Sequence, residues 1–222
     1  MGAADVSEAL MAEGVTLAVG GRVLLRDVSF RVEAGERLTV MGPSGSGKSS
    51  LLAYLGGHLD PAFAASGRVY VGEREVTNLA PERRRIGLMF QDDLLFPHLS
   101  VGANLAFGLD PAVCGRANRR ARVAEALAEA GLAGFEGRDP TTLSGGQRQR
   151  VALMRSLLAA PRALLLDEPF GKLDAELRAD MRRFVFDHAA RASLPVVTVT
   201  HDPADAQAAG CRILTLGGAD VP

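Results

Sequence analysis

The sequence lacks most features that mark secreted, membrane-spanning or nucleic-acid-binding chains. Its 222 residues have a formal net charge of −1, so no overall charge attracts the chain to nucleic acid or to anionic lipid. The longest apolar runs, such as 163–166 and 195–199, are much shorter than the roughly 20 residues that cross a bilayer as a helix. The first residues contain an early acid and no basic-then-apolar pattern, so we do not expect a secretory signal.

Cysteine and lysine are scarce. Cys114 and Cys211 stand alone, without the Cys-x-x-Cys spacing or neighbouring His that a metal site needs. We therefore expect no disulfide framework, and a reducing compartment fits best. Lys48 and Lys172 are the only lysines, and the remaining Lys or Arg positions are all arginine. Codon usage explains that bias for the chain as a whole, but a flexible ammonium group such as that of Lys48 is suited to reach phosphate oxygens.

Short alternating runs of apolar residues fill the first part of the chain and predict strands. Glycine pairs separate several of these runs. A helix is expected from about Lys48 to Gly56, with Leu51, Leu52 and Leu55 on one face. The predicted strands of this part cover residues 15–17, 23–25, 28–32, 37–41, 68–71 and 86–90.

Between about Phe96 and Gly145 the composition changes to Ala, Leu and Arg, and residues 119–130 place apolar side chains at helical spacing. We interpret this segment as a helical subdomain. The remaining predicted elements are strands at 163–167, 196–200 and 212–216 and a helix at 175–190. Strand, helix and strand in this order indicate a parallel sheet with a right-handed crossover.

A glycine-rich loop lies between the predicted strand 37–41 and the predicted helix. Its glycines allow successive backbone amides to turn inward around an anion, and the helix that starts here adds its N-terminal dipole. An ordinary Gly/Ser turn is the alternative, but the complete eight-residue pattern between strand and helix favours a phosphate loop. Lys48 is expected to contact the terminal phosphates and Ser49 to hold Mg²⁺. The residues predicted to bind the nucleotide are Gly42, Pro43, Ser44, Gly45, Ser46, Gly47, Lys48, Ser49 and Ser50.

Two acidic residues follow the apolar run 163–166. A buried strand can deliver Asp167 rigidly to the edge of the sheet beside the loop, where we expect it to hold Mg²⁺ through water. Glu168 is then placed to orient or polarise the attacking water, as a general base or an electrostatic anchor. An acidic pair after a strand more often caps a helix or faces solvent, but the phosphate loop favours the catalytic interpretation.

A third motif, Leu143-Ser144-Gly145-Gly146-Gln147, lies far downstream of the phosphate loop. It leads into a predicted helix, so its hydroxyl and amides form another anion-binding helix start. Together with the phosphate loop, this run resembles the signature of the ATP-binding subunits of ABC transporters. The resemblance implies an α/β fold with a P-loop NTPase (RecA-like) core, an antiparallel β subdomain and an inserted α-helical subdomain. It also implies an ATPase that uses ATP and Mg²⁺.

The resemblance divides one ABC ATPase domain, 1–222, into two parts. Residues 14–90 and 146–222 are expected to form the catalytic core with the β subdomain. Residues 91–145 are expected to contain the Q-loop and the helical subdomain with the signature.

The resemblance also assigns roles to three single residues. Gln91 resembles the Q-loop residue that senses Mg²⁺ or the lytic water, and His201 resembles the switch histidine that contacts the γ-phosphate. Asp174 resembles the D-loop aspartate that contacts the opposite subunit. Alone, each of these residues would more often be a surface or capping residue.

In the family, the signature faces the γ-phosphate bound by a partner chain, and two ATP molecules are sandwiched between head-to-tail subunits. ATP then holds the dimer closed, because the nucleotide binds the closed arrangement better than the open one, and hydrolysis releases it. The resemblance therefore implies a homodimer or a pair with a second ATPase subunit.

The chain departs from the family pattern at two places. Val19 aligns with the aromatic residue that usually stacks on adenine, and a branched aliphatic side chain offers less stacking area. We expect Val19→Tyr to tighten ATP binding. The D-loop has Gly171-Lys172 where Ser-Ala is common, which affects the expected communication between sites rather than nucleotide binding.

The run from Phe90 to Val101, with Asn104 and 107–109, resembles bacterial binding-protein-dependent importers, and the short C-terminus is closest to compact thiamine-, polyamine- or iron-type ATPases. The implied partners are integral-membrane permease subunits and, indirectly, a substrate-binding protein, with no nucleic acid. The implied location is peripheral, at the cytoplasmic face of the bacterial inner membrane. Leu94, Leu95 and Phe96 are candidates for a groove that receives a permease helix, although they can equally belong to the subdomain core. The alternatives are an exporter subunit or a soluble ABC ATPase in DNA repair or translation, and the cargo cannot be read.

Overall fold

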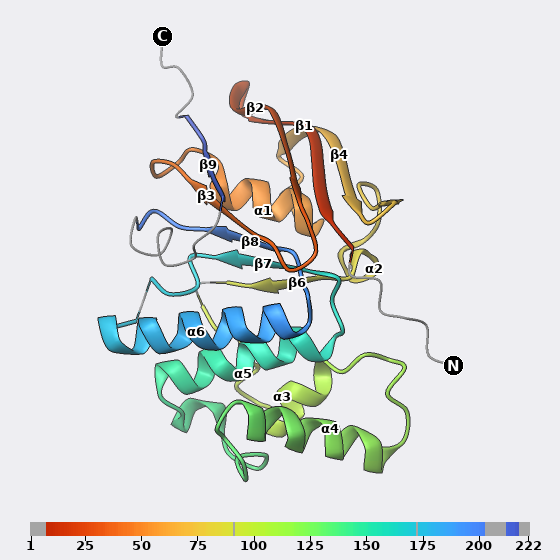
Figure 1. Ribbon diagram of the computed structural model, residues 1–222, viewed down its shortest axis with the longest axis vertical. Helices are drawn as coiled ribbons and strands as arrows, with labels where there is room; N and C mark the ends of the chain where they lie inside the picture. The colour runs from red at the N-terminus through yellow and green to blue at the C-terminus, as the bar shows by residue number, and fades with distance from the viewer. Residues whose placement is uncertain (1–7, 91, 172, 203–211, 218–222) are drawn as a thin grey trace. The chain divides into compact units, whose positions relative to one another are not determined.

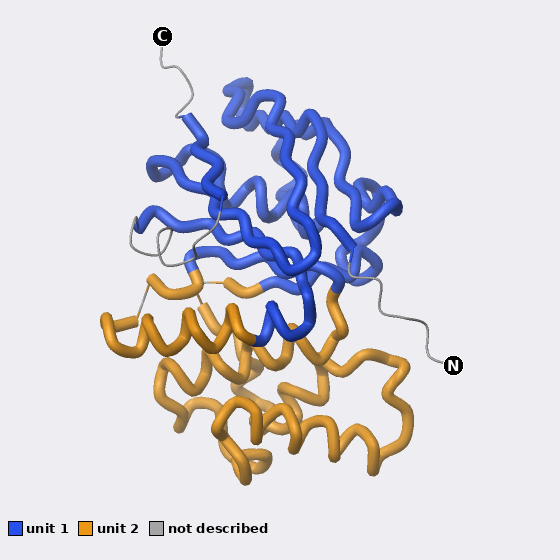
Figure 2. Tube along the Cα trace, in the orientation of Figure 1, with its two compact units in different colours: residues 1–88, 162–168, 188–222 blue, residues 89–161, 169–187 orange. Residues whose placement is uncertain are grey.

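The fold was analysed in a computed structural model, which describes residues 8–90, 92–171, 173–202 and 212–217 (Figure 1). The chain forms two compact units (Figure 2). Unit 1 comprises residues 1–88, 162–168 and 188–222, and unit 2 comprises 89–161 and 169–187. The boundaries 91 and 145 expected for the helical subdomain stay a prediction.

Unit 1 contains an antiparallel sheet and a parallel sheet. The antiparallel sheet has the strand order β2-β1-β4-β5 and is built from β1 Leu10–Val19, β2 Arg22–Val32, β4 Phe63–Val71 and β5 Arg74–Glu75. The second sheet has the order β6-β7-β8-β3-β9 and is built from β3 Arg37–Met41, β6 Ile86–Met89, β7 Ala163–Asp167, β8 Val196–Val199 and β9 Arg212–Thr215. The pairs β3–β8, β3–β9 and β7–β8 are parallel, which confirms the predicted parallel sheet.

The first strands are longer than their apolar runs predicted. Residues 23–25 and 28–32 belong to the single strand β2, which pairs with β1 through several register shifts. Such bulges bend a strand and interrupt the apolar alternation without ending the strand. Strand β4 begins at Phe63, five residues before the predicted 68–71, because Phe63, Ala64 and Ala65 continue the ladder with β1.

One hydrophobic core joins both sheets of unit 1 to helix α1, Lys48–Gly56. Leu51, Leu52 and Leu55 are fully buried on one face of α1, as their spacing predicted. They pack with residues of the antiparallel sheet and with Leu165 and Val197 of the parallel sheet. Helix α1 therefore has a fixed position relative to the ends of β3 and β7.

Unit 2 is helical. Its elements are α3 Val101–Phe107, α4 Arg116–Glu129, the short 3₁₀ helix Pro140–Thr142, α5 Gly145–Leu158 and most of α6 Ala175–Arg191. Val101 and Leu105 of α3, Leu127 of α4 and Val151 of α5 are completely buried in its core. This arrangement follows the apolar spacing of α4 and α5.

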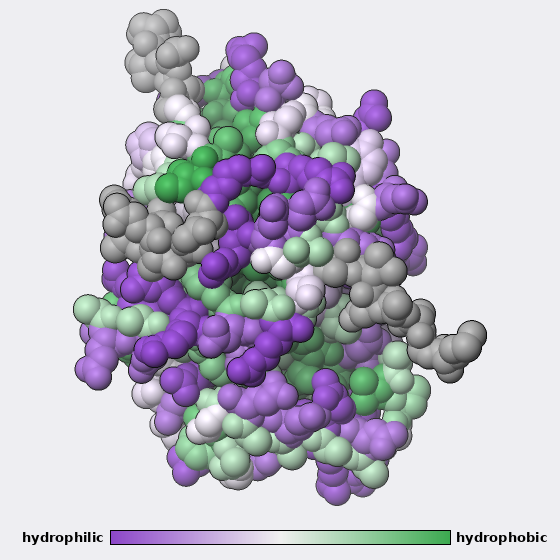
Figure 3. Space-filling model, in the orientation of Figure 1, coloured by the Kyte–Doolittle hydropathy of each residue, from purple (hydrophilic) through white to green (hydrophobic). Residues whose placement is uncertain are grey.

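The surface carries no feature of a membrane span in the described part of the chain. None of the described helices is long and apolar enough to cross a bilayer. Figure 3 shows polar residues over most of one face, with apolar residues in smaller patches between them. Scattered apolar patches of this kind are ordinary for a protein surface.

A buried arginine fixes the C-terminal end of α1. Arg84, the last residue of the short helix α2 Pro81–Arg84, is 6 % exposed. Its guanidinium donates hydrogen bonds to the carbonyl oxygens of Tyr54 and Leu55 at 2.8 and 2.9 Å, and to those of Thr77 and Leu79. Two carbonyls in the last turn of α1 are thus satisfied by a side chain from another element. Burial lowers the pKa of Arg84, and the planar guanidinium suits this set of acceptors.

We predict that Arg84→Met lowers the free energy of unfolding by about 2 kcal/mol, because buried carbonyl oxygens would lose their donors. The neighbouring Arg83 is exposed, and Arg83→Met is a matched control that should change stability little. Urea unfolding followed by circular dichroism measures both variants. Equal stability of Arg84→Met and wild type would contradict the structural role of Arg84.

Candidate functional site

The glycine-rich loop lies between β3 and α1, in unit 1. Strand β3 is flanked by β8 and β9, so the loop emerges from the interior of the parallel sheet rather than from its edge. Gly47 immediately precedes α1 and has φ 88°, and Gly45 has φ 77°. A side chain at either position would be strained by this left-handed backbone. At Gly47 it would also contact Leu25, because an added Cβ would lie 3.1 Å from the Leu25 Cγ.

Two side chains of the loop are suited to bind an anion. Lys48 is 6 % exposed, and its ammonium group donates to the carbonyl oxygens of Gly42 and Pro43 at 2.8 and 2.9 Å. Ser46 is buried, and its hydroxyl oxygen has no hydrogen-bond partner among the residues that the structure describes. A buried hydroxyl without a partner carries an energetic penalty, which an anion accepting its hydrogen bond would remove. The cation, the hydroxyl and the helix start thus fit phosphate oxygens.

The predicted metal-binding pair comes together at the same place. The Ser49 hydroxyl donates to Asp167 Oδ1 at 3.0 Å, although 118 positions separate the two residues in the chain. Burial raises the pKa of Asp167, and the Glu168 carboxylate raises it further, whereas the hydrogen bond from Ser49 and the charge of Lys48 lower it. A half-buried carboxylate beside a hydroxyl is an oxygen donor set that suits Mg²⁺. The residues present therefore fit the expected ion.

Glu168 and His201 form a second contact next to this pair. His201 Nδ1 lies 3.0 Å from Glu168 Oε1, and the Glu168 amide donates to the Val199 carbonyl at the end of β8. Glu168 has φ 45°, a backbone conformation that non-glycine residues rarely adopt. Strain of this kind often occurs at functional sites. The Glu168 side chain is 25 % exposed, so the carboxylate is accessible to a water molecule.

The signature residues lie in unit 2, at the start of α5. Ser144 is the N-cap of this helix, because its hydroxyl accepts from the Gln147 amide while the Gln147 side chain accepts from the Ser144 amide. This capping box satisfies two amides of the helix end. Ser144 and Gly145 are exposed, whereas Leu143 and Gly146 are buried. An added Cβ at Gly146 would lie 2.7 Å from a methyl carbon of Leu177.

The structure describes the positions of two of the remaining predicted residues, Asp174 and Val19. Asp174 accepts a hydrogen bond from the Leu177 amide at 3.0 Å, so it caps the first turn of α6. Val19 is the last residue of β1 and is half-buried. Gln91 and Lys172 lie outside the described residues.

Asn104 and Arg155 order the segment 93–100, a role that no sequence motif assigned to them. Asn104, 0 % exposed, accepts from the Phe96 amide and donates to the carbonyls of Phe96, Leu99 and Ser100. Arg155 of α5 donates to the carbonyls of Asp93 and Leu94. The available signal was the single polar side chain of Asn104 within the otherwise apolar run 101–107, because a buried amide needs partners.

Arg148 connects this segment to the signature. Its Nε donates to Asp93 Oδ2 at 2.8 Å, and its Nη1 donates to the Leu143 carbonyl at 2.6 Å. The contact therefore joins the segment after Gln91 to the residue that precedes the Ser144 cap. Leu94 and Phe107 remain 54 % and 69 % exposed on the same unit.

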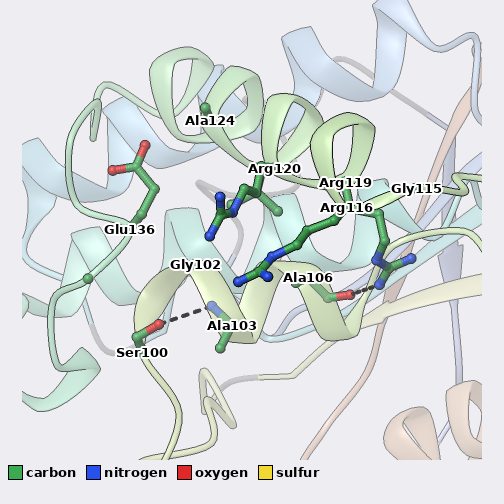
Figure 4. Close-up of a pocket in the computed structure, with 12 residues that line it drawn as sticks. Ser100, Gly102, Ala103, Ala106, Gly115, Arg116, Arg119, Arg120, Ala124 and Glu136 are labelled. Carbon is green, nitrogen blue, oxygen red and sulfur yellow. Dashed lines mark hydrogen bonds between the residues drawn. The ribbon is translucent and has the colours of Figure 1, made fainter.

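A pocket of about 870 Å³ lies between α3 and α4 in unit 2. Its walls include the apolar side chains of Ala103, Ala106 and Val123, and Figure 4 shows the arginine side chains of α4 extending toward α3. Arg119 donates to the Ala106 and Val113 carbonyls. Arg116 and Arg120 are exposed and have no hydrogen bond or ion pair with the described residues. The complete lining is Ser100, Gly102, Ala103, Ala106, Gly115, Arg116, Arg119, Arg120, Val123, Ala124, Glu136 and Gly137.

We predict that Asp167→Asn raises the melting temperature at pH 7.5 in metal-free buffer. The raised pKa of Asp167 means that its charged form disfavours the folded state. Wild-type stability should therefore fall as pH rises from about 4, the ordinary Asp pKa, through the raised value, and the variant should lack this decrease. Melting curves at pH 4 and 7.5 measure the difference, with the exposed Asp187→Asn as control. Equal melting temperatures at pH 7.5 would show that the charged carboxylate is not disfavoured.

Comparison with known proteins identifies the family. The model of the family described as ABC transporter matches residues 25–171. YnjD of Escherichia coli (strain K12), an uncharacterized ABC transporter ATP-binding protein, is 46 % identical over 199 residues, covering 90 % of this chain and 91 % of its own. The thiamine import ATP-binding protein ThiQ of Cereibacter sphaeroides is 44 % identical over 209 residues, covering 90 % of this chain and 89 % of its own.

A solved structure agrees with these relatives. It is described as the dimeric, post-hydrolysis state of the ATP-binding cassette MJ0796 bound to ADP and Pi, and it has a TM-score of 0.79 at 31 % identity. The likeness covers 94 % of this chain and 96 % of that chain, and it confirms the predicted P-loop NTPase fold class. The chain belongs to the ABC transporter family and is an ATP-binding ATPase of the cassette type.

Proposed function

We propose that this chain is the ATPase subunit of a solute importer and that it hydrolyses ATP at the site formed by the Lys48 loop, Asp167 and Glu168. The observation that carries the proposal is the Ser49–Asp167 hydrogen bond of 3.0 Å, with Glu168 as the next residue. It brings a phosphate-binding loop, a candidate metal ligand and a candidate base to one edge of a single sheet. Besides the thiamine import protein ThiQ, the similar proteins include Fe(3+) and sulfate/thiosulfate import ATP-binding proteins, which supports import.

The phosphates are held by residues of the loop 42–50. The Lys48 ammonium group exchanges its two carbonyl acceptors for phosphate oxygens, and the Ser46 hydroxyl gains the partner that it lacks. The amides at the start of α1 contribute further donors. Ser49 and Asp167 would hold Mg²⁺; the predicted further ligand, Gln91, lies outside the described residues. Bound Mg²⁺ supplies neutralisation of the charge that develops on the phosphate oxygens.

Hydrolysis then adds water across the terminal phosphoanhydride bond and gives ADP and inorganic phosphate. Glu168 accepts a hydrogen bond from the attacking water and orients it, or removes its proton. His201, in contact with Glu168 at 3.0 Å, positions that carboxylate and reaches the γ-phosphate. The proton leaves to solvent, to which both side chains are partly exposed.

Two chains complete each site. The start of α5 offers a hydroxyl and helix amides, with Ser144 and Gly145 exposed, and the phosphate loop lies in the other unit of the chain. We propose that Leu143 to Gln147 face the nucleotide held by a partner subunit and that Asp174 lies at the same interface. The dimeric state of the MJ0796 structure supports this arrangement.

The permease partner is proposed to dock on unit 2, through Leu94, Leu95 and Phe96 and the pocket between α3 and α4. Arg116 and Arg120 supply positive charge without partners in the described residues, and Ala103 and Ala106 supply an apolar wall. Charge complementarity therefore favours a permease segment that carries carboxylates together with apolar side chains. In this proposal, the contact with the permease holds the chain peripherally at the cytoplasmic face of the inner membrane.

Glu168→Gln tests the catalytic proposal. The variant is expected to bind Mg-ATP and to remain a dimer, with turnover at least about 100-fold lower, because general-base steps contribute about 10² to 10⁴ in rate. Phosphate release and light scattering measure the two properties. The exposed Glu176→Gln serves as the control and should hydrolyse ATP at the wild-type rate. Full hydrolysis by Glu168→Gln would contradict the role of this carboxylate.

Charge reversal in the pocket tests the docking proposal. Arg116→Glu and Arg120→Glu should leave hydrolysis by the purified chain unchanged. In vesicles that contain the reconstituted permease subunits, the stimulation of hydrolysis should be about tenfold lower than for wild type. Arg122 is also on α4 but pairs with Glu125 and does not line the pocket, so Arg122→Glu is the control. Equal stimulation of all three variants would exclude the pocket as the docking site.

A further inference from the structure

The end of β1 has an aromatic neighbour. Val19 stands directly opposite Phe63 on β4 and directly opposite Arg22 on β2. Opposite residues of an antiparallel pair place their side chains on the same face, with Cβ atoms about 4.5 to 5.5 Å apart. The Phe63 ring therefore lies beside Val19 on one face of the sheet, where β4 starts. Figure 1 shows β1, β2 and β4.

This face leads to the phosphate loop. Leu17 lies two residues before Val19, so both side chains are on the same face of β1. Leu17 stands opposite Leu25, and Leu25 lies so close to Gly47 that an added Cβ there would be 3.1 Å from its Cγ. Leu17 and Leu25 form the cross-strand pair next to the phosphate loop. Val19, with its cross-strand neighbours Phe63 and Arg22, is the next set of residues on the same face of the sheet.

The Phe63 ring is not part of the described hydrophobic core of unit 1. Phe63 and Val19 are half-buried, whereas Leu17 and Leu25 are buried in the core of unit 1. Among the described residues, neither Phe63 nor Val19 belongs to that core, and Phe63 makes no contact with another aromatic ring. Arg22 is exposed, and it forms no hydrogen bond or ion pair with any residue that the structure describes.

We propose that Phe63 supplies the aromatic ring that stacks on the adenine of ATP, with Val19 as an apolar contact and Arg22 at the rim. A purine presents a flat π face, and stacking on an aromatic side chain is a strong and general way to hold a base. Val19 alone offers only a small aliphatic surface. The extension of β4 by residues 63–65 brings a ring to the place where β1 provides none. The proposal rests on the phosphate site proposed at Lys48.

A single tryptophan tests the contact directly. The chain contains no Trp, so Phe63→Trp introduces one indole into the full-length protein. Its emission should decrease when Mg-ADP is added and stay constant with Mg-pyrophosphate, which carries no base. Tyr70→Trp, on the same strand, is the control, because seven residues of strand separate it from position 63 by about 23 Å. An indole at position 63 that responds to neither ligand, or to both equally, would overturn the proposal.

Affinities provide the second measurement. Phe63→Leu keeps an apolar side chain without the ring and should bind Mg-ADP about tenfold more weakly, which corresponds to the loss of one base stack, with pyrophosphate affinity unchanged. Val19→Tyr in the Phe63→Leu background should restore ADP affinity, because it places a ring on the same face. Unchanged ADP affinity of Phe63→Leu, or an equal loss for pyrophosphate, would contradict the stacking role.

Lys48→Ala separates this inference from the phosphate site. If that variant retains full affinity for pyrophosphate and ADP, the proposed phosphate site is wrong. If it loses both while Phe63→Leu loses neither, the phosphate site holds and the adenine proposal is wrong.

Discussion

The alignment of parallel strands β3, β7 and β8 is the constraint on which the site depends. Leu164 to Asp167 pair with Val196 to Val199 without a register shift, and these residues pair in turn with 37–40 of β3. The carboxyl ends of the three strands are therefore level. The loop that follows β3, the two acids at the end of β7 and His201 after β8 meet at one edge because the ladders are in register. A slip of one residue would turn the Asp167 side chain to the other face of the sheet.

Burial at the end of β7 disfavours the charged form of Asp167 and so favours binding of a cation there. Strand β7 is apolar on both faces, and Asp167 is its first polar residue after four fully buried ones. That environment raises its pKa, so the chain keeps a carboxylate where charge is disfavoured until a cation neutralises it. Among the described residues, the buried Ser46 hydroxyl has no hydrogen-bond partner, so an anion would stabilise it in the same way. In the proposed function, Mg²⁺ would neutralise the Asp167 carboxylate and a phosphate oxygen would accept the hydrogen bond of Ser46.

The two units divide the chemistry between them. Unit 1 contains the phosphate loop, Asp167, Glu168 and His201, and unit 2 contains the signature helix, Asp174 and the pocket between α3 and α4. Within unit 2, Arg148 and Arg155 connect the signature helix to residues 93 and 94. A partner that moves the segment 93–96 would therefore act on the helix that begins at Ser144. If the permease docks on this segment as proposed, this contact would be a physical route by which the permease and the nucleotide influence each other.

Much of this arrangement could be predicted from the sequence, because the motifs are local. The phosphate loop, the acidic pair after β7 and the Ser144 cap are each specified by adjacent residues, and the apolar spacing gives α1, α4 and β7. The roles of Arg84 and Asn104 could not be predicted, because their partners are backbone carbonyls of other segments. The start of β4 at Phe63 was missed for a similar reason, since small residues 64–66 have weak strand propensity and pair only because β1 continues beside them. Non-local pairing therefore decides where β4 begins and places Phe63 opposite Val19.

Mixing two inactive variants tests the central claim that each ATP is held by two chains. Lys48→Ala removes the phosphate-loop cation, and Ser144→Arg blocks the signature, so neither variant alone should hydrolyse ATP. A mixed dimer has one site in which the intact loop of one chain faces the intact signature of the other, so mixing should restore part of the wild-type hydrolysis rate. If the mixture remains as inactive as its components although mixed dimers form, the loop and the signature do not combine across two chains.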